Sequence, residues 1–167
     1  GPPVILDFAT SVVAEGKVLV AYKGGKPLPE GALIDENGNF STEPEVLYGT
    51  AGPDAPPGER NGYGAIRAMG DHKGSGLAFI CELLGGSLTG NRATGQANEH
   101  FANGMLSIYL SLETFDRGGG FADDVTRYID YVKSAKPINP DEPVLVPGDK
   151  ERQVKAERLA NGVPLSP

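Results

Sequence analysis

The chain has 167 residues, of which 39% are hydrophobic and 22% charged, and its formal net charge is −7. This length and apolar content suit a domain with a packed core and exclude a disordered chain. The negative charge argues against phosphate backbones and anionic lipid surfaces as partners, so we expect no binding to nucleic acid or to a membrane.

The cysteine and histidine counts exclude further classes of protein. A single cysteine, Cys81, excludes an internal disulfide scaffold and favours a cytoplasmic location, and its apolar neighbours predict that it is buried. The two histidines lack the spacing of zinc ligands, so we expect no metal site.

The first predicted elements are a strand and a helix. Residues 4–8 form an apolar run typical of a buried strand, and residues 12–22 have a spacing that allows a helix capped by Thr10 or Ser11. Glycine and proline then recur up to residue 70, which predicts short elements, a hairpin-like turn over residues 33–39 and a surface loop over residues 51–62.

A glycine-rich loop that leads into an apolar helix is the most informative local feature. The loop carries Gly70, Lys73, Gly74 and Gly76, and the spacing of apolar residues predicts a helix over residues 73–84. Free N–H groups at the start of a helix, together with a lysine, suit a bound anion, although a solvated or capping lysine is the alternative. The lysine precedes the second glycine, so the loop is not a P-loop, and no dinucleotide fingerprint of the Rossmann type is present.

The second half of the chain predicts two strands and two helices. The strands are expected over residues 106–112 and 144–146. An amphipathic helix is expected across residues 121–132, and a second helix is expected to run from an N-cap at Asp149 to Ala160. This order of elements, with long loops between them, predicts an α+β fold.

Three motifs follow one another along the chain. They are Asp7-Phe8-Ala9-Thr10-Ser11, then Gly70-x-x-Lys73-Gly74-x-Gly76 with Glu82-Leu83-Leu84-Gly85-Gly86, and finally Pro147-Gly148-Asp149-x-Glu151. Together they resemble the type-2 malate/L-lactate dehydrogenases, and in particular their hydroxycarboxylate dehydrogenase branch. The agreement extends over nearly the whole chain.

The resemblance implies an enzyme that depends on NAD or NADP. Such an oxidoreductase transfers a hydride between the nicotinamide cofactor and a small 2-hydroxy or 2-oxo acid such as malate or lactate. The implied fold is a non-Rossmann dinucleotide-binding fold of the α+β class, with a mixed, largely antiparallel sheet and flanking helices.

The resemblance also implies where the cofactor is held. Asp7, Phe8 and Ala9, continued by Thr10 and Ser11, would line the cofactor. Lys73 would meet its phosphate or ribose side. Pro147, Gly148 and Asp149 would supply a third contact. Local physics leaves other roles open, since Asp7 can cap a strand end, while Thr10, Ser11 and Asp149 can cap helices.

No catalytic residue is expected in this chain. The acid/base histidine of the family lies upstream of the Asp-Phe-Ala segment, so His72 is assigned a packing or rim role and His100 is expected to be exposed. Full members of the family are about twice as long. Residues 1–167 are therefore expected to form a single segment, the cofactor-binding domain and C-terminal part of such a protein.

The expected partners follow from the same resemblance. They are a 2-hydroxy or 2-oxo acid substrate, the missing N-terminal half of the same protein and a second copy in a homodimer. We expect the isolated chain to be inactive. The alternative is a noncatalytic nucleotide-binding or dimerisation module, whereas a phosphoryl-transfer enzyme is disfavoured by the position of the lysine.

Overall fold

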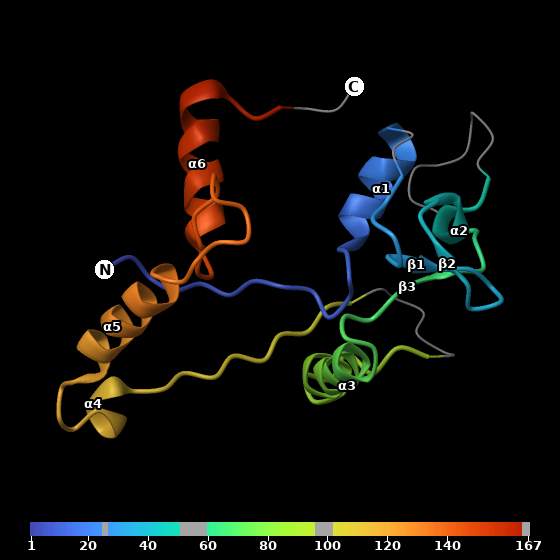
Figure 1. Ribbon diagram of the computed structural model, residues 1–167. Coiled ribbons are helices and arrows are strands. Elements are labelled where there is room, and N and C mark those ends of the chain that lie inside the picture. The colour runs from blue at the N-terminus through green and yellow to red at the C-terminus, as the bar shows by residue number, and fades with distance from the viewer. Residues whose placement is uncertain (25–26, 51–59, 96–101, 165–167) are drawn as a thin grey trace. The chain divides into compact units, whose positions relative to one another are not determined.

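Figure 1 shows the computed structural model of the chain, which describes residues 1–24, 27–50, 60–95 and 102–164. Contacts divide the chain into two compact units, one of residues 9–107 and one that combines residues 1–8 with residues 108–167. His100 and most of the surface loop expected at residues 51–62 lie outside the described residues.

The unit of residues 9–107 contains a small antiparallel sheet. Its strands are β1 (Leu33–Ile34), β2 (Phe40–Ser41) and β3 (Ala65–Ile66), in the order β2-β1-β3. The Asp35 carboxylate accepts hydrogen bonds from the backbone N–H groups of Asn37 (2.9 Å) and Asn39 (2.8 Å), which is the local turn chemistry of aspartate. The predicted hairpin is therefore confirmed.

Two helices enclose the core of this unit. They are α1 (Glu15–Gly24), which begins three residues later than predicted, and α2 (Glu45–Tyr48), which contacts β1 and β3. The Tyr22 and Tyr48 rings lie 5.2 Å apart, and the Tyr22 hydroxyl donates to the Gly49 carbonyl. The buried hydrophobic residues are Val13, Val18, Ala21, Leu28, Ala32, Leu33, Leu47 and Tyr48.

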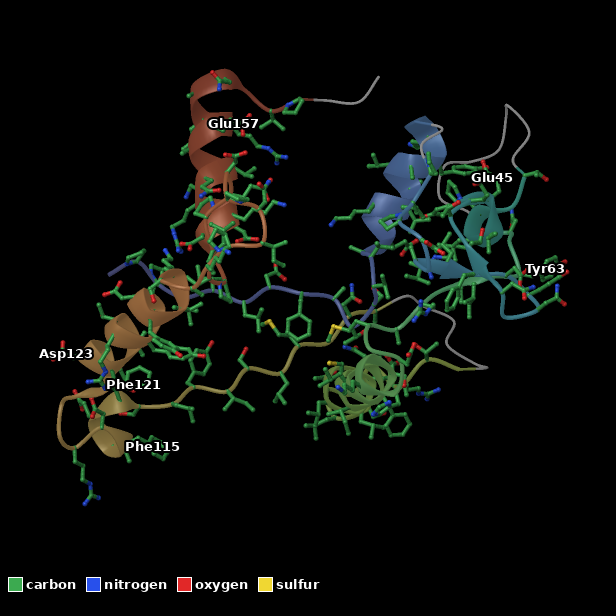
Figure 2. All side chains as sticks on the ribbon, viewed as in Figure 1. Glu45, Tyr63, Phe115, Phe121, Asp123 and Glu157 are labelled. Atoms are coloured by element: carbon green, nitrogen blue, oxygen red, sulfur yellow. The ribbon has the colours of Figure 1, made fainter. Side chains whose placement is uncertain are left out.

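The glycine-rich loop leads into helix α3 (His72–Cys81), which continues as the π-helix η1 (Glu82–Ser87). The predicted helix is confirmed, but the expected burial of Cys81 is wrong because its side chain is exposed. Apolar residues face outward on several sides, as the side chains around α3 in Figure 2 illustrate. The exposed ones are Leu77, Phe79, Ile80, Leu83 and Leu84. A helix that is apolar all round is normally covered, so α3 and η1 lack a covering layer among the residues that the structure describes.

The other unit contains three helices, namely α4 (Leu112–Phe115), α5 (Phe121–Lys133) and α6 (Asp149–Asn161). The predicted amphipathic helix is confirmed as α5, whose Val125, Ile129 and Val132 are half-buried. In Figure 2, Phe115 projects from α4, and Phe121 stands at the start of α5.

The strands predicted at residues 4–8, 106–112 and 144–146 are not formed. Residues 4–8 and 106–111 are exposed and irregular, and Leu112 instead begins α4. A strand needs a hydrogen-bonded neighbour. An apolar run or an apolar alternation in the sequence indicates only a tendency to form a strand. Among the described residues of this unit, no hydrophobic side chain is fully buried.

The structure is a mixture of helices and a small antiparallel sheet. None of its described helices is long and apolar enough to cross a bilayer.

Candidate functional site

The glycine-rich loop is anchored to the segment that follows Ala9. The Met69 N–H donates to the Thr10 carbonyl (2.9 Å), and the Gly74 N–H donates to the Met69 carbonyl (2.8 Å). A Cβ atom on Gly74 would lie 2.5 Å from the Thr10 oxygen and 2.6 Å from the Met69 nitrogen, closer than real contacts allow. Glycine at position 74 therefore lets α3 begin directly against Thr10.

Lys73 offers a cationic side chain at this loop. It is exposed, and among the described residues it forms no ion pair. Its own N–H donates to the Gly70 carbonyl (3.1 Å), and the next N–H, that of Gly74, is also bonded. The expectation of free N–H groups is therefore wrong at these two positions, whereas the Lys73 ammonium is a donor that the loop can offer to an anion.

The residues before Lys73 are held by an arginine. Arg67 pairs with Asp71 (2.8 Å) and donates to the Gly31 carbonyl (3.0 Å), and its guanidinium lies over the Phe40 ring. The pair holds the pKa of the Asp71 carboxyl below its usual value. His72, the first residue of α3, is exposed, which agrees with a rim position.

The Pro147-Gly148-Asp149 turn contacts the N-terminal segment of the chain. The Ile5 N–H donates to the Pro147 carbonyl (3.3 Å), and Arg152 of α6 donates to the Pro3 carbonyl (2.9 Å). Gly148 has a φ of 96°, in the left-handed region that glycine adopts readily. The segment that leads to Asp7 and Phe8 is thereby attached to this turn.

Asp149 is the centre of a charged cluster beneath that turn. Its carboxylate accepts from the Lys133 ammonium (2.9 Å) and the Val146 N–H (3.0 Å), and it also pairs with Arg152. The bond from Lys133, followed by those from Val146 and Arg152, holds the pKa of Asp149 well below its usual value. No side-chain cap is formed at the start of α6, so the alternative N-cap role of Asp149 is wrong.

The predicted cofactor contacts fall in both units. Asp7, Phe8 and the turn at residues 147–149 belong to one unit, whereas Ala9 and Lys73 belong to the other. Asp7 and Phe8 are exposed. Both carboxylate oxygens of Asp149 are engaged within the chain, so a ligand at this turn would meet mainly its backbone.

A pocket of about 580 Å³ lies within the unit of residues 9–107. Four segments line it, namely Thr10, the end of α3 with η1, residues 91–95 and residues 102–104. None of the seven predicted cofactor contacts lines it. The motif Glu82-Leu83-Leu84-Gly85-Gly86 could have pointed to it, because Glu82, Gly85 and Gly86 are lining residues. Among the described residues, no cluster of three or more potential metal ligands occurs.

Comparison with known proteins identifies a family. The family model for malate/L-lactate dehydrogenase matches residues 1–167. Hydroxycarboxylate dehydrogenase B of Escherichia coli (strain K12) is 35% identical, and the alignment covers 98% of this chain but 43% of that protein. Malate dehydrogenase of Pyrococcus horikoshii is 30% identical, with 98% and 45% covered.

A solved structure is also similar. A protein from E. coli, assigned as a malate/lactate dehydrogenase, superposes with a TM-score of 0.78 at 32% identity and covers 99% of this chain. The superposition covers 44% of the E. coli chain. The present chain thus spans less than half the length of the relatives that it matches.

Proposed function

Because the chain belongs to the malate/L-lactate dehydrogenase family, we propose that it carries the nicotinamide-binding part of a 2-hydroxyacid oxidoreductase. The observation that carries this proposal is the family match over all 167 residues. The reaction would interconvert a small 2-hydroxy acid and its 2-oxo acid, as the names of the malate and hydroxycarboxylate dehydrogenases suggest. The absence of a Rossmann fingerprint supports a non-Rossmann mode of binding.

The residues that the family resemblance implies would hold the cofactor in this proposal. Lys73 would bind a phosphate or ribose oxygen, because its ammonium is exposed and forms no ion pair within the described part of the chain. Asp7, Phe8 and Ala9 would line the cofactor. Pro147 and Gly148 would contribute backbone contacts, with Asp149 fixing their turn from beneath. When bound, the nicotinamide ring would supply or accept the hydride.

The proton donor of the reaction would come from outside these residues. Since the chain spans less than half of its relatives, we propose that an N-terminal part of the same protein supplies the acid/base histidine. Residues 1–167 would then act as one functional segment, the cofactor-binding and C-terminal part of the enzyme. The single cysteine, which is exposed, suits a reducing, cytoplasmic location.

An assay of NADH and NADPH oxidation with pyruvate or oxaloacetate tests this proposal. The isolated 167-residue chain should show no turnover. A polypeptide extended at its N-terminus to the length of the family should oxidise one of the two cofactors. Turnover by the verified 167-residue chain would refute the proposal that the proton donor lies outside these residues. A folded extended chain that shows no turnover with any 2-oxo acid tried would refute the proposed reaction.

A dimerisation module is the second candidate, and the surface of α3 and η1 supports it. Leu77, Phe79, Ile80 and Leu84 are exposed there, and an exposed apolar patch commonly marks a contact with another chain or segment. A homodimer is compatible with the enzymatic proposal as well. Light scattering of the purified chain distinguishes a monomer from a dimer. A dimer that binds neither NADH nor NADPH would favour the noncatalytic module.

A further inference from the structure

The pocket beside η1 contains a carboxylate that is already used within the chain. Glu82 accepts hydrogen bonds from the N–H and the hydroxyl of Thr94, the latter at 2.8 Å. These bonds hold the pKa of Glu82 below its usual value, so the group is charged near neutral pH. Glu82 therefore fixes the position of residues 91–95 along one wall of the pocket.

Arg92 lies in that wall and has an unusual backbone. Its φ is 63°, in the left-handed region that residues other than glycine adopt at an energetic cost. Its carbonyl packs closely on η1, because a Cβ atom on Gly86 would lie 2.7 Å from the Arg92 oxygen. The contact with η1 and the Glu82–Thr94 bonds together hold Arg92 in this conformation.

The Arg92 guanidinium is the only cationic group among the described residues that line the pocket. The two arginines of the described segment before α3, Arg60 and Arg67, pair with Glu15 and Asp71. Arg92 forms no ion pair within the described part of the chain. Arg92 thus lines the pocket on a constrained backbone, and so does Glu82, one of whose carboxylate oxygens accepts both bonds from Thr94.

We propose that Arg92 binds an anionic oxygen group, a carboxylate or a phosphate, in the pocket formed by Thr10, η1 and residues 91–95. The planar guanidinium donates two parallel hydrogen bonds to such groups, which a lysine cannot reproduce. The proposal that an anion binds is supported by the pocket and does not depend on the proposed function. The identity of the anion rests on the proposed function, which offers the carboxylate of the 2-oxo acid and a phosphate of the cofactor as its two sources.

Small anions distinguish the two sources. Oxalate represents the carboxylate next to a carbonyl group, whereas 2′,5′-ADP and 5′-ADP differ by the phosphate that separates NADP from NAD. Each is titrated into the 167-residue chain by NMR or calorimetry. Oxalate binding that depends on Arg92 identifies a carboxylate site. A preference for 2′,5′-ADP over 5′-ADP that depends on Arg92 identifies a phosphate site.

Three variants make the dependence on Arg92 specific. Arg92→Gly removes the guanidinium but relieves the backbone at φ 63°, so it should fold at least as well as the wild type. It should bind the preferred anion at least tenfold more weakly, and Arg92→Lys should recover that loss only in part. Arg117→Met removes another exposed arginine, in the other unit, and should bind like the wild type.

The proposal is overturned if the wild type binds none of the three anions, or if Arg92→Gly binds them equally well. An equal loss in Arg117→Met would also overturn it, since binding would then reflect net charge alone. Failure of the proposed function gives a different pattern. If NADH and NADPH do not bind but oxalate binds through Arg92, the proposed nucleotide site is refuted and the proposed anion site at Arg92 is supported.

Discussion

The ammonium of Lys133 lies 2.9 Å from a carboxylate oxygen of Asp149, and this ion pair joins the end of α5 to the first residue of α6. The other carboxylate oxygen pairs with Arg152, which also donates to the Pro3 carbonyl. The Asp149 side chain is only 11% exposed, whereas that of Lys133 is 41% exposed. One carboxylate thus connects two helices, the turn at residues 147–149 and the N-terminal segment.

The first prediction concerns the charge of Asp149. Asp149→Asn keeps the size of the side chain but leaves the two cations without their shared partner, so the thermal midpoint should fall. Hydrogen exchange at the Ile5 amide should also accelerate, because the turn that accepts its bond is loosened. Glu157→Gln, an exposed change on the same helix that Figure 2 labels, should alter neither measurement. Equal behaviour of the two variants would mean that the cluster does not hold the turn.

The second prediction concerns the pH dependence of stability. The pKa of Asp149 is lowered on folding from an ordinary value of 3.8, so its charge stabilises the native state fully at pH values above the unfolded pKa. That contribution should decline as the pH falls below about 4 towards the native pKa. The difference in unfolding free energy between wild type and Asp149→Asn should therefore shrink between pH 7 and pH 3. A difference that stays constant or grows would contradict the assigned ion pairs.

The third prediction concerns the start of α3. Gly74→Ala places a Cβ atom against the backbone of Thr10 and Met69, and we expect a loss of about 1–3 kcal/mol or more in the free energy of unfolding. Gly76→Ala is the matched control, since nothing lies within 4 Å of its Cβ position. That change should stabilise the helix by about 0.5–1 kcal/mol. Urea denaturation measures both, and equal effects at the two positions would refute the close approach at Gly74.

Local sequence signals predicted the elements that depend on local interactions. The hairpin follows from Asp35 and the Asn37-Gly38 turn, and the helix α5 follows from the apolar spacing of Val125, Ile129 and Val132. These elements form because their hydrogen bonds and half-buried faces arise within a few residues of each other.

Long-range interactions explain what the sequence did not reveal. Residues 4–8 form an apolar run and residues 106–111 alternate as strands do, but no neighbouring strand pairs with either segment within the described residues. Asp149 looks like an N-cap, yet Lys133, sixteen positions earlier, takes its carboxylate. The positive φ of Arg92 depends on its contact with η1, which no short motif indicates. The cofactor contacts expected at Asp7, Phe8, Ala9, Lys73 and the turn at residues 147–149 stay predictions.

Titration of NADH and NADPH into the 167-residue chain, followed by nicotinamide fluorescence, tests the central claim most directly. We predict saturable binding of at least one cofactor. Lys73→Ala should weaken it roughly 10- to 100-fold, as expected when a charge-assisted hydrogen bond is lost. Lys136→Ala, which removes an exposed lysine of the other unit, should leave the affinity unchanged. Absence of binding to the folded wild type would contradict a nicotinamide site in this chain, and equal binding by Lys73→Ala would contradict the role of Lys73.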